Sequence, residues 1–267
     1  MTADVSVLHA AGGRLAYRRS GAGPPLLLLH GGWSDGRDWL PQLDSLSDEF
    51  DVIAWDAPGC GGSDDPARPA TIAGYADAVA DLVLGLGLGA AHLCGLSFGG
   101  GLALAVYREH PELVRSLVLV SAYAGWRGSL PPEEVAARLQ RVRAELGRPP
   151  AEWIDGYLPG FFARRVPAET LALVRSTMLD VRREGTEAML AAFADADLRD
   201  VLPTVAVPTL VLHGSADVRA PRPVADALYR SIPGARLVVL PGVGHVINLE
   251  VPEAFDREVR DFLRTVD

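Results

Sequence analysis

The chain has 267 residues, enough for one large domain with a well-buried core, and its hydrophobic fraction of 49% is that of an ordinary globular protein. Its 25 basic and 34 acidic residues give a formal net charge of −9 without a basic cluster, which argues against binding to nucleic acid or to an anionic membrane surface. The sequence contains no lysine, so Schiff-base chemistry and a phosphate-binding lysine loop are excluded.

Short apolar runs alternate with longer segments of helical spacing, a pattern typical of an α/β domain. In chain order it predicts an antiparallel hairpin at a sheet edge, two buried strands, a helix, a third buried strand, a second helix and a fourth buried strand. The expected ranges are residues 5–9 and 14–19 for the hairpin, then 25–29, 51–55, 72–86, 91–95, 98–110 and 116–121.

Residues 122–200 break this alternation. They contain no convincing strand, and prolines separate their amphipathic helical segments. We interpret them as a helical cap inserted into a core domain made of residues 1–121 and 201–267. Strands resume at residues 209–213 and 236–240, and each is followed by a helix.

Two cysteines, Cys60 and Cys94, are too few for a disulfide framework or a metal knuckle. Cys94 lies on a buried strand as a small apolar filler, whereas Cys60 lies in a loop, where we expect partial reactivity. The N-terminus resembles no signal peptide, and no stretch approaches the roughly 18 apolar residues of a membrane span. We therefore expect a cytoplasmic protein with reduced cysteines. Separately, we expect a monomer or homodimer that binds a small molecule and needs no cofactor or metal.

The strongest chemical signal is the run Gly95-Leu96-Ser97-Phe98-Gly99, which directly follows an apolar strand and opens a helix. A turn this tight places its central residue in strained backbone geometry, and glycine two positions away on each side prevents Cβ clashes. The hydroxyl is then presented at a helix N-terminus, where a developing anion is favoured. The pattern predicts Ser97 as a catalytic nucleophile.

A serine nucleophile needs a base, and the base needs a carboxylate that orients it. His245 follows the last strand in a glycine-rich loop, and the other histidines lie in less suitable positions at strand or helix ends. Asp217 lies four residues after His213, which ends the strand expected at residues 209–213. The rival loop after residue 121 offers no acid. The sequence therefore predicts His245 as base and Asp217 as its orienting acid.

Two backbone N–H groups should hold the oxyanion. The first belongs to Phe98, the residue after the nucleophile, and the second comes from the loop that begins at His30. In that loop we prefer Gly32, where the backbone can approach closely, with Trp33 as the alternative. His30 itself is expected to orient the loop by hydrogen bonding.

Five segments together carry a family resemblance: LLLLHGG, WDAPGCGGSDDP, CGLSFGG, PTLVLHGSADVRAP and PGVGHVINLEVPEAF. They resemble the α/β-hydrolase superfamily over residues 15–263, except in the cap. The resemblance implies an eight-stranded, mostly parallel sheet with helices on both faces and a helical cap after strand six. Serine in the elbow resembles the esterase, lactonase, carbon–carbon hydrolase and cofactor-free haloperoxidase branches. Haloalkane dehalogenases and epoxide hydrolases place aspartate there and are disfavoured.

These features predict a hydrolase for a small or medium apolar ester or lactone that works through an acyl-enzyme. Trp33, Trp126 and Phe162 are expected to line the substrate pocket. A carbon–carbon bond hydrolase and a biosynthetic acyl transferase or cyclase are alternatives that use the same triad. An alternative of another class is a ligand receptor with slow turnover, which a substrate panel would distinguish by a burst without steady-state hydrolysis.

Overall fold

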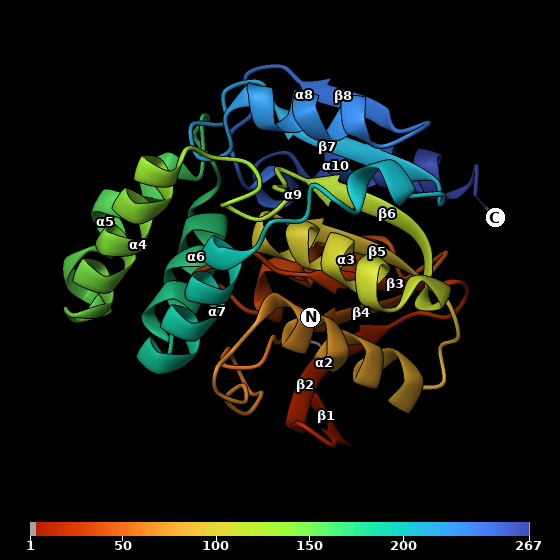
Figure 1. Ribbon diagram of the computed structural model, residues 1–267, viewed down its shortest axis with the longest axis horizontal. Coiled ribbons are helices and arrows are strands. Elements are labelled where there is room, and N and C mark those ends of the chain that lie inside the picture. Colours follow the sequence, from red (N-terminus) through yellow and green to blue (C-terminus); the bar gives the residue numbers. More distant parts are fainter. Residues whose placement is uncertain (1–3, 267) are drawn as a thin grey trace.

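The computed structural model describes residues 4–266 and contains one eight-stranded sheet with the strand order β1-β2-β4-β3-β5-β6-β7-β8 (Figure 1). The pairs β1–β2 and β2–β4 are antiparallel, and all other neighbouring strands are parallel. The strands are β1 (Ser6–Ala10), β2 (Gly13–Ser20), β3 (Pro25–Leu29), β4 (Asp51–Trp55), β5 (Ala91–Leu96), β6 (Val114–Val120), β7 (Thr209–Gly214) and β8 (Arg236–Leu240).

Helices cover both faces of this sheet. In Figure 1, α2, α3 and α8 lie in front of it, and α10 lies behind it, where α10 contacts α1. The α-helices are α1 (Leu40–Ser45), α2 (Ile72–Gly85), α3 (Phe98–Glu109), α4 (Pro132–Leu146), α5 (Ile154–Tyr157), α6 (Ala168–Leu179), α7 (Arg183–Asp195), α8 (Arg222–Ser231), α9 (Ile247–Glu250) and α10 (Pro252–Leu263). Short 3-10 turns are η1 (Gly36–Trp39), η2 (Pro111–Leu113), η3 (Pro150–Glu152), η4 (Leu158–Gly160) and η5 (Leu202–Thr204).

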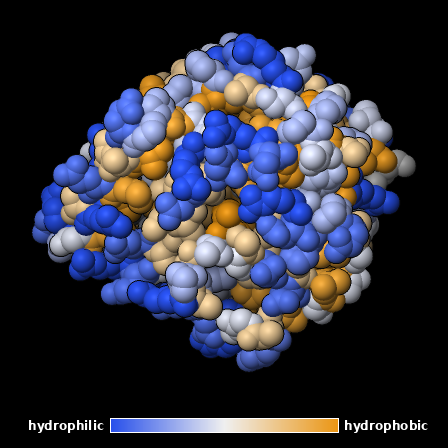
Figure 2. All heavy atoms as spheres, viewed as in Figure 1, coloured by the Kyte–Doolittle hydropathy of each residue, from blue (hydrophilic) through white to orange (hydrophobic). Residues whose placement is uncertain are grey.

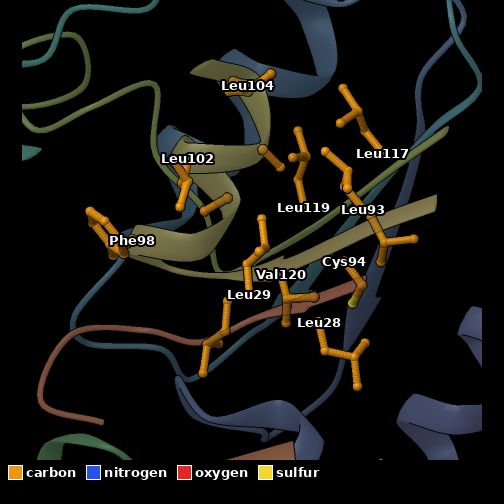
Figure 3. Packing of buried hydrophobic residues seen from close by; sticks show 14 of the residues in the cluster. Leu28, Leu29, Leu93, Cys94, Phe98, Leu102, Leu104, Leu117, Leu119 and Val120 are labelled. Atoms are coloured by element: carbon orange, nitrogen blue, oxygen red, sulfur yellow. The ribbon is translucent and has the colours of Figure 1, made fainter. Parts of the chain in front are cut away.

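The central strands β3, β5 and β6 are buried on both faces over nearly all of their length, which explains why their residues are mostly apolar rather than alternating. Figure 3 shows Leu93 of β5 with Leu117 and Leu119 of β6 on the side of the sheet that carries Leu102 and Leu104 of α3. Cys94 points to the opposite side, together with Leu28 of β3, and is fully buried there, as expected of a small apolar filler. The predicted sheet and its helices on both faces are thereby confirmed, and most element boundaries agree within two residues.

The segment of residues 122–200 forms α4 to α7 and the short turns between them, without a strand, between β6 and β7. Figure 1 shows these helices gathered at one end of the sheet. Its helices α4 and α7 contact each other, and α7 also contacts α2 and α3, two of the helices that cover the sheet. We call residues 122–200 the inserted segment.

The molecular surface in Figure 2 is a mosaic in which hydrophobic residues form small groups separated by hydrophilic ones. None of the helices found between residues 4 and 266 is long and apolar enough to cross a membrane.

Candidate active site

Ser97 occupies the turn between β5 and α3 with φ 54° and ψ −107°, a conformation that non-glycine residues rarely adopt. The turn is held from both sides, because the Ser97 N–H donates to Val120 O at 2.8 Å and its carbonyl accepts from Gly101 N. A Cβ on Gly95 would lie 2.1 Å from Gly99 O, and a Cβ on Gly99 would lie 2.1 Å from Leu29 O. Both neighbours are backbone atoms that cannot move aside, so the elbow requires both glycines.

We expect Gly99→Ala to prevent folding or to lower the free energy of unfolding by about 3 kcal/mol or more, since the new methyl would overlap a strand carbonyl. Gly156 provides a matched control, because a Cβ there would have no heavy atom within 4 Å. Gly156→Ala, within α5, should be neutral or stabilising by about 0.5–1 kcal/mol. Equilibrium urea unfolding of both variants measures the difference, and similar midpoints for the two would contradict the packing argument.

His245 and Asp217 form a buried pair. The imidazole Nδ1 lies 2.8 Å from Asp217 Oδ2, and both side chains are almost fully shielded from solvent. The other carboxylate oxygen, Oδ1, accepts hydrogen bonds from Arg219 N at 2.8 Å and Ala220 N at 2.9 Å. Three donors thus fix the carboxylate, which in turn fixes the orientation of the imidazole ring.

The environment of Asp217 keeps it ionised. Burial by itself would raise the pKa of this carboxyl. This effect of burial is outweighed by the charge of His245, by its hydrogen bond and by the two backbone N–H donors. Together they hold the pKa of Asp217 below its ordinary value. A carboxylate in this state can stabilise an imidazolium across the physiological pH range.

The end of β6 is hydrogen-bonded both to the turn that carries Ser97 and to the loop that carries His245. Val120 O accepts from Ser97 N, and the hydroxyl of the next residue, Ser121, donates to His245 O at 2.9 Å. Adjacent residues therefore hold the two loops, and Ser97 and His245 line the same cavity. The side chains predicted from separate motifs are brought to one edge of the sheet.

The loop after β3 is held by His30, as the sequence indicated. Its Nε2 accepts from Ala57 N at 3.0 Å, so its proton lies on Nδ1, which donates to Gly31 O at 2.7 Å. Burial lowers the pKa of His30, in agreement with a neutral ring. Because a trans peptide directs its C=O and N–H oppositely, fixing Gly31 O also fixes the direction of the Gly32 N–H.

A cavity of about 630 Å³ opens over Ser97 and His245. Of the three residues expected in the substrate pocket, Trp33 and Trp126 line this cavity. Phe162 does not, and the neighbouring Phe161 does. The aromatic side chain of this stretch that borders the cavity thus stands one position before Phe162. Sequence reasoning also missed the polar part of the wall. Its charged residues are Asp38, Glu134, Arg138, Arg141, Glu145 and Arg219.

Asp38 is the most buried of these charged residues, with 5% of its surface exposed. Asp38 Oδ1 accepts from Thr177 Oγ1 at 3.4 Å. The backbone carbonyl of Asp38 accepts from Asn248 Nδ2 at 2.9 Å. Burial raises the pKa of Asp38 to about 7, although a hydrogen bond from Ser34 partly opposes the rise.

This raised pKa makes a pH-dependent contribution to stability. Between about pH 4 and pH 7 the folded protein retains a proton on Asp38 that the unfolded chain has released, so the free energy of unfolding falls as pH rises through that range. We expect Asp38→Asn to remove this term. The stability of the variant relative to the parent should increase by about 2–4 kcal/mol between pH 4 and pH 8. Chemical unfolding at several pH values measures the change, and a pH-independent difference would contradict it.

No metal-binding arrangement accompanies this site: between residues 4 and 266, no group of three or more His, Cys, Asp or Glu side chains could hold an ion.

The sequence matches the family described as alpha/beta hydrolase over residues 26–258. A solved structure of a thermophilic esterase from Thermogutta terrifontis is 31% identical, superposes with a TM-score of 0.89 and covers 99% of both chains. The enol-lactonase from Burkholderia xenovorans LB400 is 30% identical, with a TM-score of 0.86 over 97% of this chain and 100% of that one. The serine hydrolase BPHL of Mus musculus is 32% identical across 98% of this chain and 88% of that protein.

Proposed function

The chain belongs to the alpha/beta hydrolase family, and on this basis we propose that it hydrolyses carboxylic esters or lactones through Ser97, His245 and Asp217. The observation that carries the proposal is the buried pair of His245 and Asp217, joined at 2.8 Å, on the same cavity as a serine in a strained strand-to-helix turn. The named activities of the esterase and enol-lactonase relatives support this substrate class.

In the proposed mechanism, Ser97 Oγ attacks the substrate carbonyl while His245 Nε2 accepts its proton. The Nδ1 proton remains hydrogen-bonded to Asp217, which stabilises the imidazolium. Protonation of the leaving oxygen by His245 then releases the alcohol, or opens the ring of a lactone, and leaves an acyl-enzyme. His245 next activates a water molecule that hydrolyses the acyl ester and restores the serine.

We propose that the N–H groups of Phe98 and Gly32 hold the tetrahedral oxyanion, with Trp33 as the alternative to Gly32. Phe98 begins α3, so its N–H is one of the free donors at the helix N-terminus. His30 fixes the peptide that carries the Gly32 donor. Each such donor typically contributes roughly 3–4 kcal/mol to transition-state stabilisation.

The inserted segment is proposed to act as a cap that selects the substrate. It supplies the aromatic wall with Trp126, Tyr157 and Phe161, and the polar wall with Arg138 and its neighbours. The sequence alone suggested an apolar substrate. The charged residues on the wall instead favour an ester or lactone that carries a polar group beside its apolar part.

A substrate panel tests the proposal. It should contain chromogenic esters of increasing acyl length, five- and six-membered lactones, and a vinylogous diketone for carbon–carbon cleavage. We expect steady hydrolysis of at least one ester or lactone. Cleavage of the diketone alone would favour a carbon–carbon hydrolase, and a single burst without turnover would favour a ligand receptor.

The cavity lining provides a sharper test of selection. Trp126→Leu should alter the ratio of kcat/KM values between short and long substrates by roughly 1–3 kcal/mol, because its ring borders the cavity. Phe162→Leu is the matched control, since Phe162 belongs to the same segment but does not line the cavity. Equal effects of the two substitutions on the ratio would contradict the assignment of the wall.

A further inference from the structure

Residues 157–164 of the inserted segment run from α5 towards α6 and are hydrogen-bonded to the loop that carries His245. Phe161 O accepts from the backbone N–H groups of His245 at 2.9 Å and Val246 at 3.2 Å. The Phe161 ring lies nearly parallel to the imidazole, with centroids 6.5 Å apart. The catalytic histidine thus takes its main-chain position from the inserted segment as well as from the core.

Glu250, at the end of α9, joins the same two stretches of chain. One carboxylate oxygen accepts from Arg164 N at 2.8 Å and Ala163 N at 3.2 Å, and the other accepts from Gly244 N at 2.8 Å. Only 8% of Glu250 is exposed, so these donors replace water around a buried carboxylate. Hydrogen bonds to a charged acceptor are among the stronger ones in proteins.

The fit around Gly244 supports the same connection independently. A Cβ at this position would lie 2.7 Å from Ala163 N, 2.8 Å from Glu250 Oε2 and 2.8 Å from Phe161 O. All three atoms belong to the junction between the inserted segment and the histidine loop. The residue before the catalytic histidine is therefore glycine because the inserted segment passes so close to it.

Two arginines extend the connection on both sides. The Arg164 guanidinium donates to Pro241 O and, at 2.9 Å, to Gly242 O, at the start of the histidine loop. Arg219, two residues after the orienting acid, donates to Gly160 O and Tyr157 O at 3.1 Å each. Its guanidinium lies 4.0 Å from the Tyr157 ring centroid, so the acid loop is also bound to residues 157–164.

We propose that residues 157–164 form a latch that positions His245 for catalysis, with Glu250 and Arg164 as its positioning residues. This inference rests on the proposed function of His245. Besides shaping the pocket, the inserted segment is attached to the His245 loop. This attachment sets the distance and angle between the imidazole and the Ser97 hydroxyl. Misplacing a catalytic group by about 1 Å can cost about 100-fold in rate, so a loosened latch should lower kcat more than substrate binding.

The test compares Glu250→Gln, Glu250→Ala and Arg164→Ala with Arg165→Ala. Arg165 is the matched control, since it is the adjacent arginine and is exposed. The readouts are kcat and KM for a short acetyl ester, the rate of Ser97 labelling by a small fluorophosphonate, and amide hydrogen exchange of residues 241–246. Melting temperatures of all variants are measured alongside.

We expect kcat and the labelling rate to fall about 10- to 100-fold in Glu250→Ala, less in Glu250→Gln, which retains one acceptor oxygen, and severalfold in Arg164→Ala. KM should change less than about threefold, amide exchange of residues 241–246 should increase, and Arg165→Ala should resemble the parent. If the Glu250 variants do not fold, the result for Arg164→Ala alone tests the latch. Arg164 is exposed, so we expect this variant to fold.

Parent-like kcat and labelling in folded Glu250→Gln and Arg164→Ala would overturn the latch, whatever the exchange data show. A parent protein that neither hydrolyses esters nor labels at Ser97 would instead refute the proposed function. In that case the exchange rates still report on the attachment, and unchanged exchange in Glu250→Gln would refute the latch separately.

Discussion

Ser97→Ala should abolish hydrolysis and leave the fold unchanged. Alanine and serine meet the same steric restriction at φ 54°, so the strained elbow gains no new cost, and only the attacking oxygen is lost. Removal of a triad nucleophile in other serine hydrolases lowers kcat by about 10⁴-fold or more, and a similar loss is expected here.

The matched control is Ser176→Ala in α6, which removes a hydroxyl that donates to Leu173 O of its own helix. Initial rates on the best substrate of the panel, with melting temperatures measured in parallel, make the comparison. Ser97→Ala with more than about one hundredth of the parent rate in a pure preparation would contradict the assignment of the nucleophile.

Asp217→Asn should lower kcat by roughly 10³- to 10⁴-fold, for a reason that lies in its hydrogen bonds. Oδ1 accepts from Arg219 N and Ala220 N, so the oxygen of an asparagine would remain there and its NH₂ group would face His245. The imidazole would then have to present an unprotonated Nδ1, which places its proton on Nε2 and prevents Nε2 from accepting the serine proton.

Asp226→Asn provides the control for this substitution, because it makes the same chemical change in a surface ion pair with Arg222. Its kcat should stay within about twofold of the parent, as expected for an exposed pair. Stopped-time assays at pH 8 compare the two variants. Equal kcat values for the parent and a folded Asp217→Asn protein would show that Asp217 does not orient the base.

Local sequence was enough to predict most of the fold. The central strands are apolar on both faces, and their runs are too short for helices, so their periodicity left few alternatives. The placement of Ser97, Asp217 and His245 at one edge of the sheet could also be predicted, because each residue follows closely after a strand, and the carboxyl ends of parallel strands meet at one edge. Glycine patterns around Ser97 and His245 gave further local signals.

The features that sequence reasoning missed depend on contacts between distant segments. Phe161 and Phe162 are identical in type, and only the path of the chain after η4 decides which one faces the cavity. Because Arg219 is only two residues after Asp217, the sequence places it near the site. Its contact with the Tyr157 ring, however, depends on how the inserted segment packs.

The expectation for Cys60 was wrong for a similar reason. Its loop is covered by the inserted segment, where Cys60 Sγ lies 3.9 Å from Met189 Sδ, and only 5% of Cys60 is exposed. Burial raises the pKa of the thiol, so little of it ionises and its reactivity is low. A residue in a loop of the sequence can thus be a core residue in the fold.

The central claim is that Ser97 is a nucleophile activated by His245 and Asp217. Its most direct measurement is reaction with a small fluorophosphonate, followed by peptide mapping of the adduct by mass spectrometry. We expect a single adduct on Ser97 in the parent, none in Ser97→Ala and much slower labelling in Asp217→Asn. Labelling of another residue, or undiminished substrate turnover by a fully labelled enzyme, would contradict it.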